Sequence, residues 1–208
     1  MKYIIILMLA WQCAYAQSLS YYSVLTNMVT ALHEPNGTVS TSHTNQLVDS
    51  GMSFSNEIHR ININLVYAIS LVDICERDLS GDVLLPQAIS ICSNILTSSH
   101  INSNAWQKGV AGIVLSNIYS FDGKRLEAYS IMTNNNVFSS YVISNGEDSY
   151  LWNGIAEHLK IDGLSVIDAI RCYTAVSKIN IGSKSDISSY TNGLPQTILI
   201  KLTELINL

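Results

Sequence analysis

The stretch that decides the fold class is FSNEIHRININLVYAISLVDIC, residues 54–75. Its apolar residues recur every three or four positions, the spacing that places side chains on one face of an α-helix. The stripe consists of Phe54, Ile58, Ile61, Leu65, Ala68, Val72 and Cys75. Strict alternation, which is typical of a half-buried strand, is scarce throughout the chain. The stretch therefore predicts a long amphipathic helix.

Similar stripes predict further helices before and after this one. A stripe from Leu19 to Leu32 comes first, and Ser80-Gly81-Asp82 followed by Pro86 is typical of a turn leading into a new helix. Later stripes begin near Trp106, Leu126, Leu151, Val166 and Pro195. We expect an all-α fold of about eight helices in antiparallel hairpins, either a helical bundle or a short array of hairpins.

The first 16 residues have the order of a secretory signal peptide. Lys2 precedes a short apolar run, and Ala14-Tyr15-Ala16 follows it. The run has about nine residues, whereas about 20 are needed to span a bilayer. We expect residues 1–16 to be removed and the protein to be periplasmic or secreted, with no membrane span.

The remaining residues, 17–208, predict a single helical domain. Residues 34–53 form the longest weakly structured connection, and a loop of this length is either functional or mobile. Residues 178–193 are polar and predict a linker before the last helix.

Composition disfavours several classes of partner. The formal net charge is −5, with 48% hydrophobic and 13% charged residues. Lys and Arg form no cluster, and neutralising phosphates requires one, so we expect no nucleic acid partner. The same shortage disfavours docking on anionic lipid.

Three cysteines follow residue 16, and an exported protein can form one disulfide from them. We favour Cys75 with Cys92, because both would lie on neighbouring helices joined by a short turn. The alternative is that Cys75, Cys92 and Cys172 are all small buried side chains. Neither a CxxC pair nor a His at ligand spacing is present, so we expect no metal site.

No motif for catalysis or cofactor binding is found, and we expect no cofactor and no catalytic residue. The five histidines do not have the HExxH spacing of helical metalloproteases. Glu157 and His158 are adjacent on a helix and would point about 100° apart. The alternative is an enzyme whose site assembles from distant residues, such as Glu157 with His59.

The stretch SYLWNGIAEHLKIDGLSVIDAIRCYTAV, residues 149–176, contains two amphipathic segments separated by a glycine. Its pattern of large and small residues is carried by Trp152, Ile155, Ala156, Leu159, Gly163, Ala169 and Tyr173. This pattern resembles tetratricopeptide and Sel1-like helical repeats, and residues 105–131 resemble them more faintly. The resemblance implies stacked helical hairpins, which hold protein partners in those families.

These observations together favour an exported, non-enzymatic helical protein that binds another protein, as an accessory or assembly factor of an envelope, secretion or pilus system. Tyrosine is abundant, with 11 in the chain, and aromatic side chains are favoured at interfaces. Tyr141, Tyr150 and Trp152 are the predicted partner contacts. The alternative is a periplasmic immunity protein that inhibits a toxin through residues 34–53 or 144–149.

Overall fold

The computed structural model describes residues 21–32, 45–46, 48–49, 53–78, 81–103, 105–134, 147–159, 161, 163–183 and 187–207. Within these residues all regular structure is helical, which confirms the all-α prediction. Residues 21–32 are helical and precede the elements with complete bounds. These are α3 (Glu57–Asp78), α4 (Gly81–Thr97), α5 (Trp106–Phe121), α6 (Arg125–Asn134), α7 (Glu147–His158), α8 (Val166–Asn180), α9 (Ser188–Thr191) and α10 (Gln196–Asn207).

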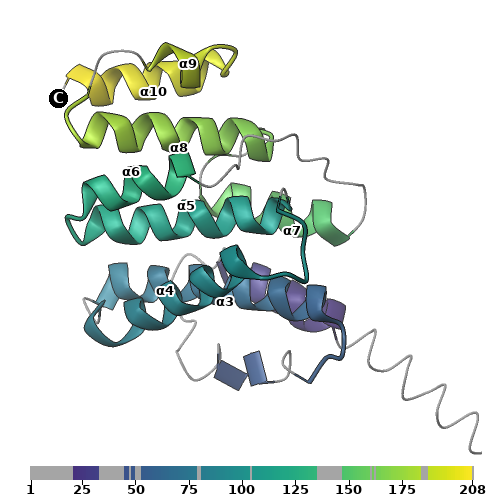
Figure 1. The fold of residues 1–208 in the computed structure, drawn as a ribbon. Coiled ribbons are helices and arrows are strands. Elements are labelled where there is room, and N and C mark those ends of the chain that lie inside the picture. The colour runs from purple at the N-terminus through teal and green to yellow at the C-terminus, as the bar shows by residue number, and fades with distance from the viewer. Residues whose placement is uncertain are drawn as a thin grey trace, which may run out of the picture.

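The helices form stacked layers (Figure 1). Helices α3 and α4 form one antiparallel hairpin, and α5 and α6 form the next. Helix α5 packs on both α3 and α4, and α8 packs in the same way on α5 and α6. Helices α9 and α10 cover α8 and complete the stack.

Side-chain contacts show that α3, α5 and α8 run in the same direction. Near the start of α5, Gln107 Nε2 donates to Asn62 Oδ1, early in α3, at 3.0 Å. In the second half of α5 the hydroxyls of Ser116 and Ser177 are hydrogen-bonded at 3.1 Å, close to the end of α8. Figure 1 shows the three helices lying side by side in successive layers.

Helix α7 departs from the hairpin pattern because it runs parallel to residues 21–32. Three contacts occur in the same order along both segments. The rings of Tyr22 and Tyr150 are 5.9 Å apart, Val29 contacts Gly154, and His158 Nδ1 donates to the carbonyl oxygen of Leu32 at 3.0 Å. Since His158 Nε2 also lies 3.7 Å from Asp73 Oδ1 in the second half of α3, α7 runs parallel to α3 as well.

It follows that α7 and α8 run in the same direction, and residues 159–165 bring the chain back between them. The sequence pattern of residues 149–176 suggests two segments in one hairpin, but their helices do not form an antiparallel pair. Ile161 N donates to the carbonyl oxygen of Ala156 at 2.8 Å, and Leu164 N to that of Ile161 at 3.1 Å. Ile161 and Leu164 are both buried, so this return is anchored in the core.

Helix α3 is buried on more sides than its stripe predicts. Ile63, Val66 and Ile69 lie outside the stripe and are buried, because α4, α5 and residues 21–32 surround the helix. Ile58, which belongs to the stripe, is 44% exposed near the start of the helix. Among the described residues, the stretch Glu57–Glu76 of this helix is long and apolar enough to cross a membrane, and 67% of it is buried in the fold. A buried core helix meets the same criteria, so this is weak evidence of a span.

The predicted linker at residues 178–193 is partly wrong. Helix α8 continues to Asn180 because Ile179 extends its apolar face and is only 8% exposed. Gly182, with a φ of 80°, follows the end of α8, and the short helix α9 lies within the remaining part. In the predicted loop at residues 34–53, residues 45–46 and 48–49 are helical.

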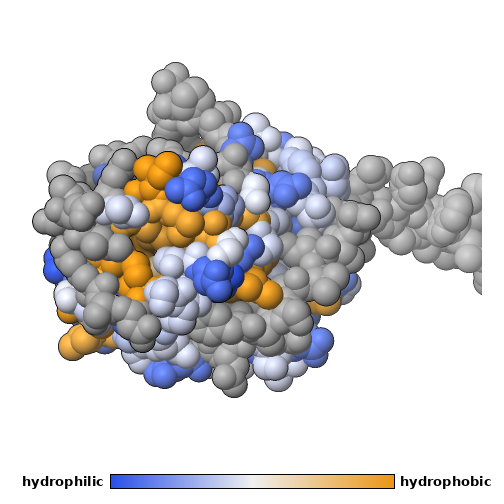
Figure 2. Space-filling model, turned by 90° about the horizontal axis from the view of Figure 1, so that it is seen from above, coloured by the Kyte–Doolittle hydropathy of each residue, from blue (hydrophilic) through white to orange (hydrophobic). Residues whose placement is uncertain are grey.

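The last layer has a small core of its own. Ala175, Ile179, Leu194 and Leu202 are its buried members. Half-buried apolar side chains from α8 to α10 surround them, and Ile200 is 50% exposed. Figure 2 shows this end of the stack from above, with hydrophobic residues gathered near the middle of the face.

Candidate functional site

Helix α7 has two distinct faces, which decide what it can contact. Leu151, Ile155 and Ala156 are buried in the core, as their spacing predicts. Tyr150 and Asn153 lie one turn apart on the opposite face and are exposed. The helix therefore presents a narrow exposed stripe of polar and aromatic side chains.

Gly154 allows α7 to approach residues 21–32 closely. A Cβ atom at this position would lie 2.4 Å from Cγ1 of Val29, which is shorter than any normal contact. Val29 is itself 4% exposed and has a β-branched side chain with little freedom at χ1. The glycine thus fixes the position of α7, and with it the positions of Tyr150 and Trp152.

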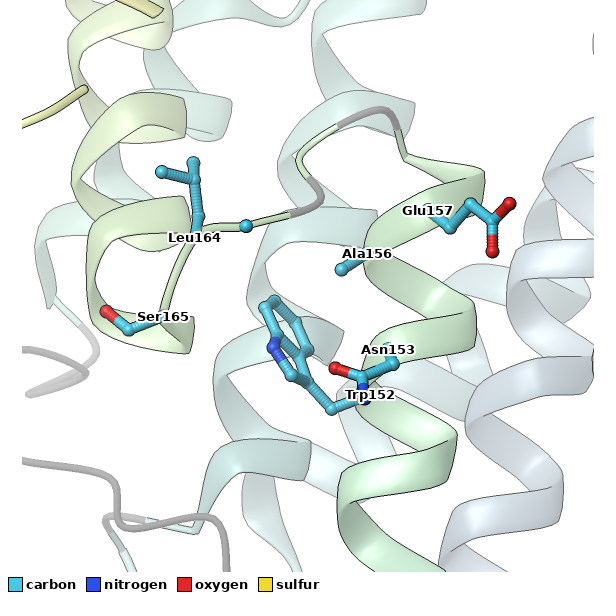
Figure 3. A pocket seen from close by; sticks show the side chains of 7 residues that line it. Trp152, Asn153, Ala156, Glu157, Leu164 and Ser165 are labelled. Carbon is cyan, nitrogen blue, oxygen red and sulfur yellow. The ribbon is translucent and has the colours of Figure 1, made fainter.

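A cavity of about 500 Å³ lies between α7 and the start of α8 (Figure 3). Sites for small ligands typically have volumes of about 300–1,000 Å³. The cavity is lined by Trp152, Asn153, Ala156, Glu157, Gly163, Leu164 and Ser165. It is formed because the chain returns at residues 159–165 and separates α7 from α8, whereas an antiparallel hairpin would bring two such helices together.

The indole of Trp152 projects into this cavity. The side chain is only 6% exposed, and Figure 3 shows its ring nitrogen on the side that faces Ser165. No hydrogen bond to Nε1 is found within the described residues. The amide of Asn153 lies beside the indole in the same view.

The remaining lining groups contribute little charge. Ser165 is the N-cap of α8: its Oγ accepts from Asp168 N at 3.2 Å and donates to Asp168 Oδ2 at 2.8 Å. In Figure 3 the carboxylate of Glu157 points away from the cavity. The interior therefore combines apolar surface with neutral hydrogen-bonding groups.

Tyr22 and Tyr150 form an exposed aromatic pair next to this site. They are 46% and 36% exposed, and their rings are tilted by 39°. Tyr150 is one helical turn before Asn153, which lines the cavity, so the pair and the cavity belong to one surface. We call this surface, formed by Tyr22, Tyr150, Asn153 and the cavity, the α7 surface.

Two of the three predicted contact residues thus lie on one surface, Tyr150 outside and Trp152 inside the cavity. Tyr141 and residues 144–146 lie outside the described residues, as do residues 1–16. The sequence placed Tyr22 with Tyr150 among the tyrosines that suit an interface but did not pair them, and it missed Asn153 and the contribution of Leu164 and Ser165. The spacing of Tyr150 and Asn153 was visible in the sequence, but Tyr22 is 128 residues from its partner and no local pattern connects them.

Other polar side chains in the interior have a structural role. Asn62 Nδ2 donates to Tyr21 Oη at 3.0 Å, and Gln107 Nε2 donates to Asn62 Oδ1 at 3.0 Å. The ring of Tyr21 also stacks on His59, with ring centroids 3.6 Å apart. This buried chain connects residues 21–32, α3 and α5, and it satisfies polar groups that would otherwise be costly to bury.

The cysteines do not form the predicted disulfide, since Cys75, Cys92 and Cys172 are all free thiols. In the α3–α4 hairpin, Cys75 lies three residues before the end of α3 and Cys92 eleven residues after the start of α4. The difference of eight residues separates them by about 12 Å along the helix axes, too far for a disulfide.

Burial raises the pKa of the Cys92 thiol to about 12 and also raises the pKa of Cys75 and Cys172. These thiols are protonated near neutral pH and are poor nucleophiles.

Two groups considered for a dispersed catalytic site lie far apart. Because α7 and α3 are parallel and His158 lies beside Asp73, Glu157 is near the second half of α3. His59 is 14 residues before Asp73, which corresponds to about 21 Å along the helix. Among the described residues, no group of three or more His, Cys, Asp or Glu side chains could hold a metal ion.

No protein-family model, curated protein or solved structure matches this chain.

Proposed function

We propose that this protein is exported and binds another protein through the α7 surface, as an accessory factor in the cell envelope. The observation that carries the proposal is the exposed pair of Tyr22 and Tyr150 beside the cavity that contains Trp152. Tyrosine and tryptophan bury a large area with few rotatable bonds, and for this reason they are enriched at interfaces.

The arrangement of the remaining groups supports contact rather than bond cleavage. The buried amides of Asn62 and Gln107 are used to connect residues 21–32, α3 and α5. The thiols of Cys75, Cys92 and Cys172 are held in their protonated form by burial. The α7 surface offers a partner the exposed rings of Tyr22 and Tyr150 and the cavity beside them.

Site-specific photo-crosslinking tests the proposal. Tyr150 is replaced by p-benzoylphenylalanine in the cells that make the protein, and crosslinked products are identified by mass spectrometry. A matched control places the same photo-reactive residue at Leu126, which is 69% exposed on α6. We expect one envelope protein to be crosslinked from Tyr150 and not from Leu126, and purified partner to bind wild-type protein more tightly than the Tyr22→Ser/Tyr150→Ser double variant.

Export is tested on the same material. The N-terminal sequence of the protein recovered from the envelope or medium should begin at Gln17.

Equal crosslinking from both positions, or binding that is unaffected by the double variant, would contradict the role of the α7 surface. A crosslinked partner that is an envelope-degrading toxin, inhibited by this protein, would identify it as an immunity protein.

A further inference from the structure

The cavity beside Trp152 has the chemistry of a site for one particular kind of ligand. Its apolar surface is formed by the indole ring, Ala156 and Leu164. Gly163 adds open space, since a Cβ atom there would meet nothing within 4 Å. An uncharged apolar group of a ligand would be favoured against this surface, because its burial removes apolar area from water.

The polar groups in the cavity form a complementary pair. Trp152 Nε1 donates to no group among the described residues and lies at the cavity, so it is available to a ligand. The amide of Asn153, which also lines the cavity, offers an acceptor and donors. The backbone of a peptide supplies carbonyl oxygens for the indole N–H and N–H groups for the amide oxygen.

The charge of the site argues against ionic ligands. Of the described lining residues only Glu157 is charged, and its carboxylate points away from the cavity. A phosphate or carboxylate ligand would find no cation among these residues, and a charge buried without a partner is unfavourable. The described lining residues therefore favour a neutral ligand.

We infer that this cavity binds a short uncharged peptide segment of a protein partner. One apolar side chain of the segment lies against Trp152, Ala156 and Leu164. A backbone carbonyl of the segment accepts from Trp152 Nε1, and a backbone N–H of the segment donates to the Asn153 amide oxygen. This inference rests on the proposed function and names the part of the partner that the α7 surface recognises.

The test follows the indole N–H signals of the full-length protein by ¹H–¹⁵N NMR during titration with capped pentapeptides. The probe is acetyl-SGLGS-amide, and acetyl-SGDGS-amide and acetyl-SGKGS-amide are the charged controls. The Trp152 signal, assigned by its loss in Trp152→Phe, should shift and saturate with the leucine peptide. The charged peptides should bind at least about tenfold more weakly, because the described lining residues include no cation and the carboxylate of Glu157 points away from the cavity.

Two variants test the hydrogen bonds. Trp152→Phe keeps an aromatic ring but removes the N–H, and binding followed at the Leu164 amide should weaken about five- to tenfold. Asn153→Ala changes an exposed position with little risk to the fold and should weaken binding several-fold. The matched control is Trp106→Phe, which removes a buried N–H that has no partner among the described residues and lies outside the cavity, and it should leave binding unchanged.

Several outcomes would overturn the inference. These are equal binding of the charged peptides, unchanged binding in both Trp152→Phe and Asn153→Ala, or no shift of the Trp152 signal. Cyclohexanone has a carbonyl oxygen but no N–H, and if it bound as tightly as the leucine peptide, the cavity would be a site for small molecules. Crosslinking from Tyr150 without peptide binding would remove this inference and leave the proposed function, whereas peptide binding without any crosslinked partner would contradict the function.

Discussion

The contact between Gly154 and Val29 gives a sharp test of how α7 is held, through the substitution Gly154→Ala. In an unconstrained helix this change is stabilising by about 1 kcal/mol, because alanine loses less conformational freedom on folding. Here the added methyl group would lie 2.4 Å from Cγ1 of Val29. Relieving such overpacking typically costs about 1–3 kcal/mol. The cost of the clash is expected to exceed the gain in helix propensity, so the free energy of unfolding should fall by about 1 kcal/mol.

A double-mutant cycle separates the two effects. In the background of Val29→Ala the obstructing methyl groups are absent, so Gly154→Ala should become stabilising by up to about 1 kcal/mol. The sign reversal corresponds to a coupling energy of about 2 kcal/mol between the two positions. Free energies of unfolding are measured by urea denaturation followed by far-ultraviolet circular dichroism.

The neighbouring substitution Asn153→Ala is the control, because it adds helix propensity at an exposed position of α7. It should be neutral or slightly stabilising in both backgrounds. If Gly154→Ala stabilises the wild-type protein, or if its effect is the same in the wild-type and Val29→Ala backgrounds, then α7 does not pack on residues 21–32 as described.

Three further predictions concern the interior. Asn62→Leu should lower the free energy of unfolding by about 2–4 kcal/mol, because it removes the buried hydrogen bonds of Asn62 to Tyr21 and to Gln107. Ser70→Ala, which loses only a bond to the carbonyl of Val66 in the same helix, should cost far less when both are compared by urea denaturation. Ser165→Ala removes the N-cap of α8 and should cost about 1 kcal/mol in the same assay; an unchanged midpoint would contradict the capping bond. The raised pKa of Cys92, about 12 against an ordinary thiol value of 9.0, stabilises the folded state below pH 9, and this stabilisation is lost as the pH rises toward 12. Between pH 9 and 12 the free energy of unfolding should therefore fall more steeply for the wild-type protein than for Cys92→Ala. The difference in slope should be about 1.4 kcal/mol per pH unit, and parallel pH profiles would refute the raised pKa of Cys92.

The fold class was predictable from the sequence because it depends on spacing within single helices. The stripe from Ile61 to Cys75 indicates a helix whatever surrounds it, and the turn at Gly81 follows from local chemistry. How many sides of α3 are buried depends on α4, α5 and residues 21–32 together. The burial of Ile63 therefore could not be inferred from the stripe.

The site was only partly predictable, because it depends on helix direction and on partners far apart in the chain. Two amphipathic segments separated by Gly163 suggest a hairpin, yet a return of a few residues can also bring α8 back parallel to α7. The predicted disulfide between Cys75 and Cys92 was wrong for a related reason. Adjacent helices are necessary for it, but the two cysteines must also lie at the same height along the hairpin.

The parallel contact of α7 with residues 21–32 also bears on how the protein is made. His158 and Leu32 are separated by 126 residues, so the first helix must be synthesised long before the helix that covers it. At about 5–20 residues per second this interval lasts roughly 6–25 s. During that time Val29 and its apolar neighbours lack their final cover, and the unfinished chain stays accessible to chaperones.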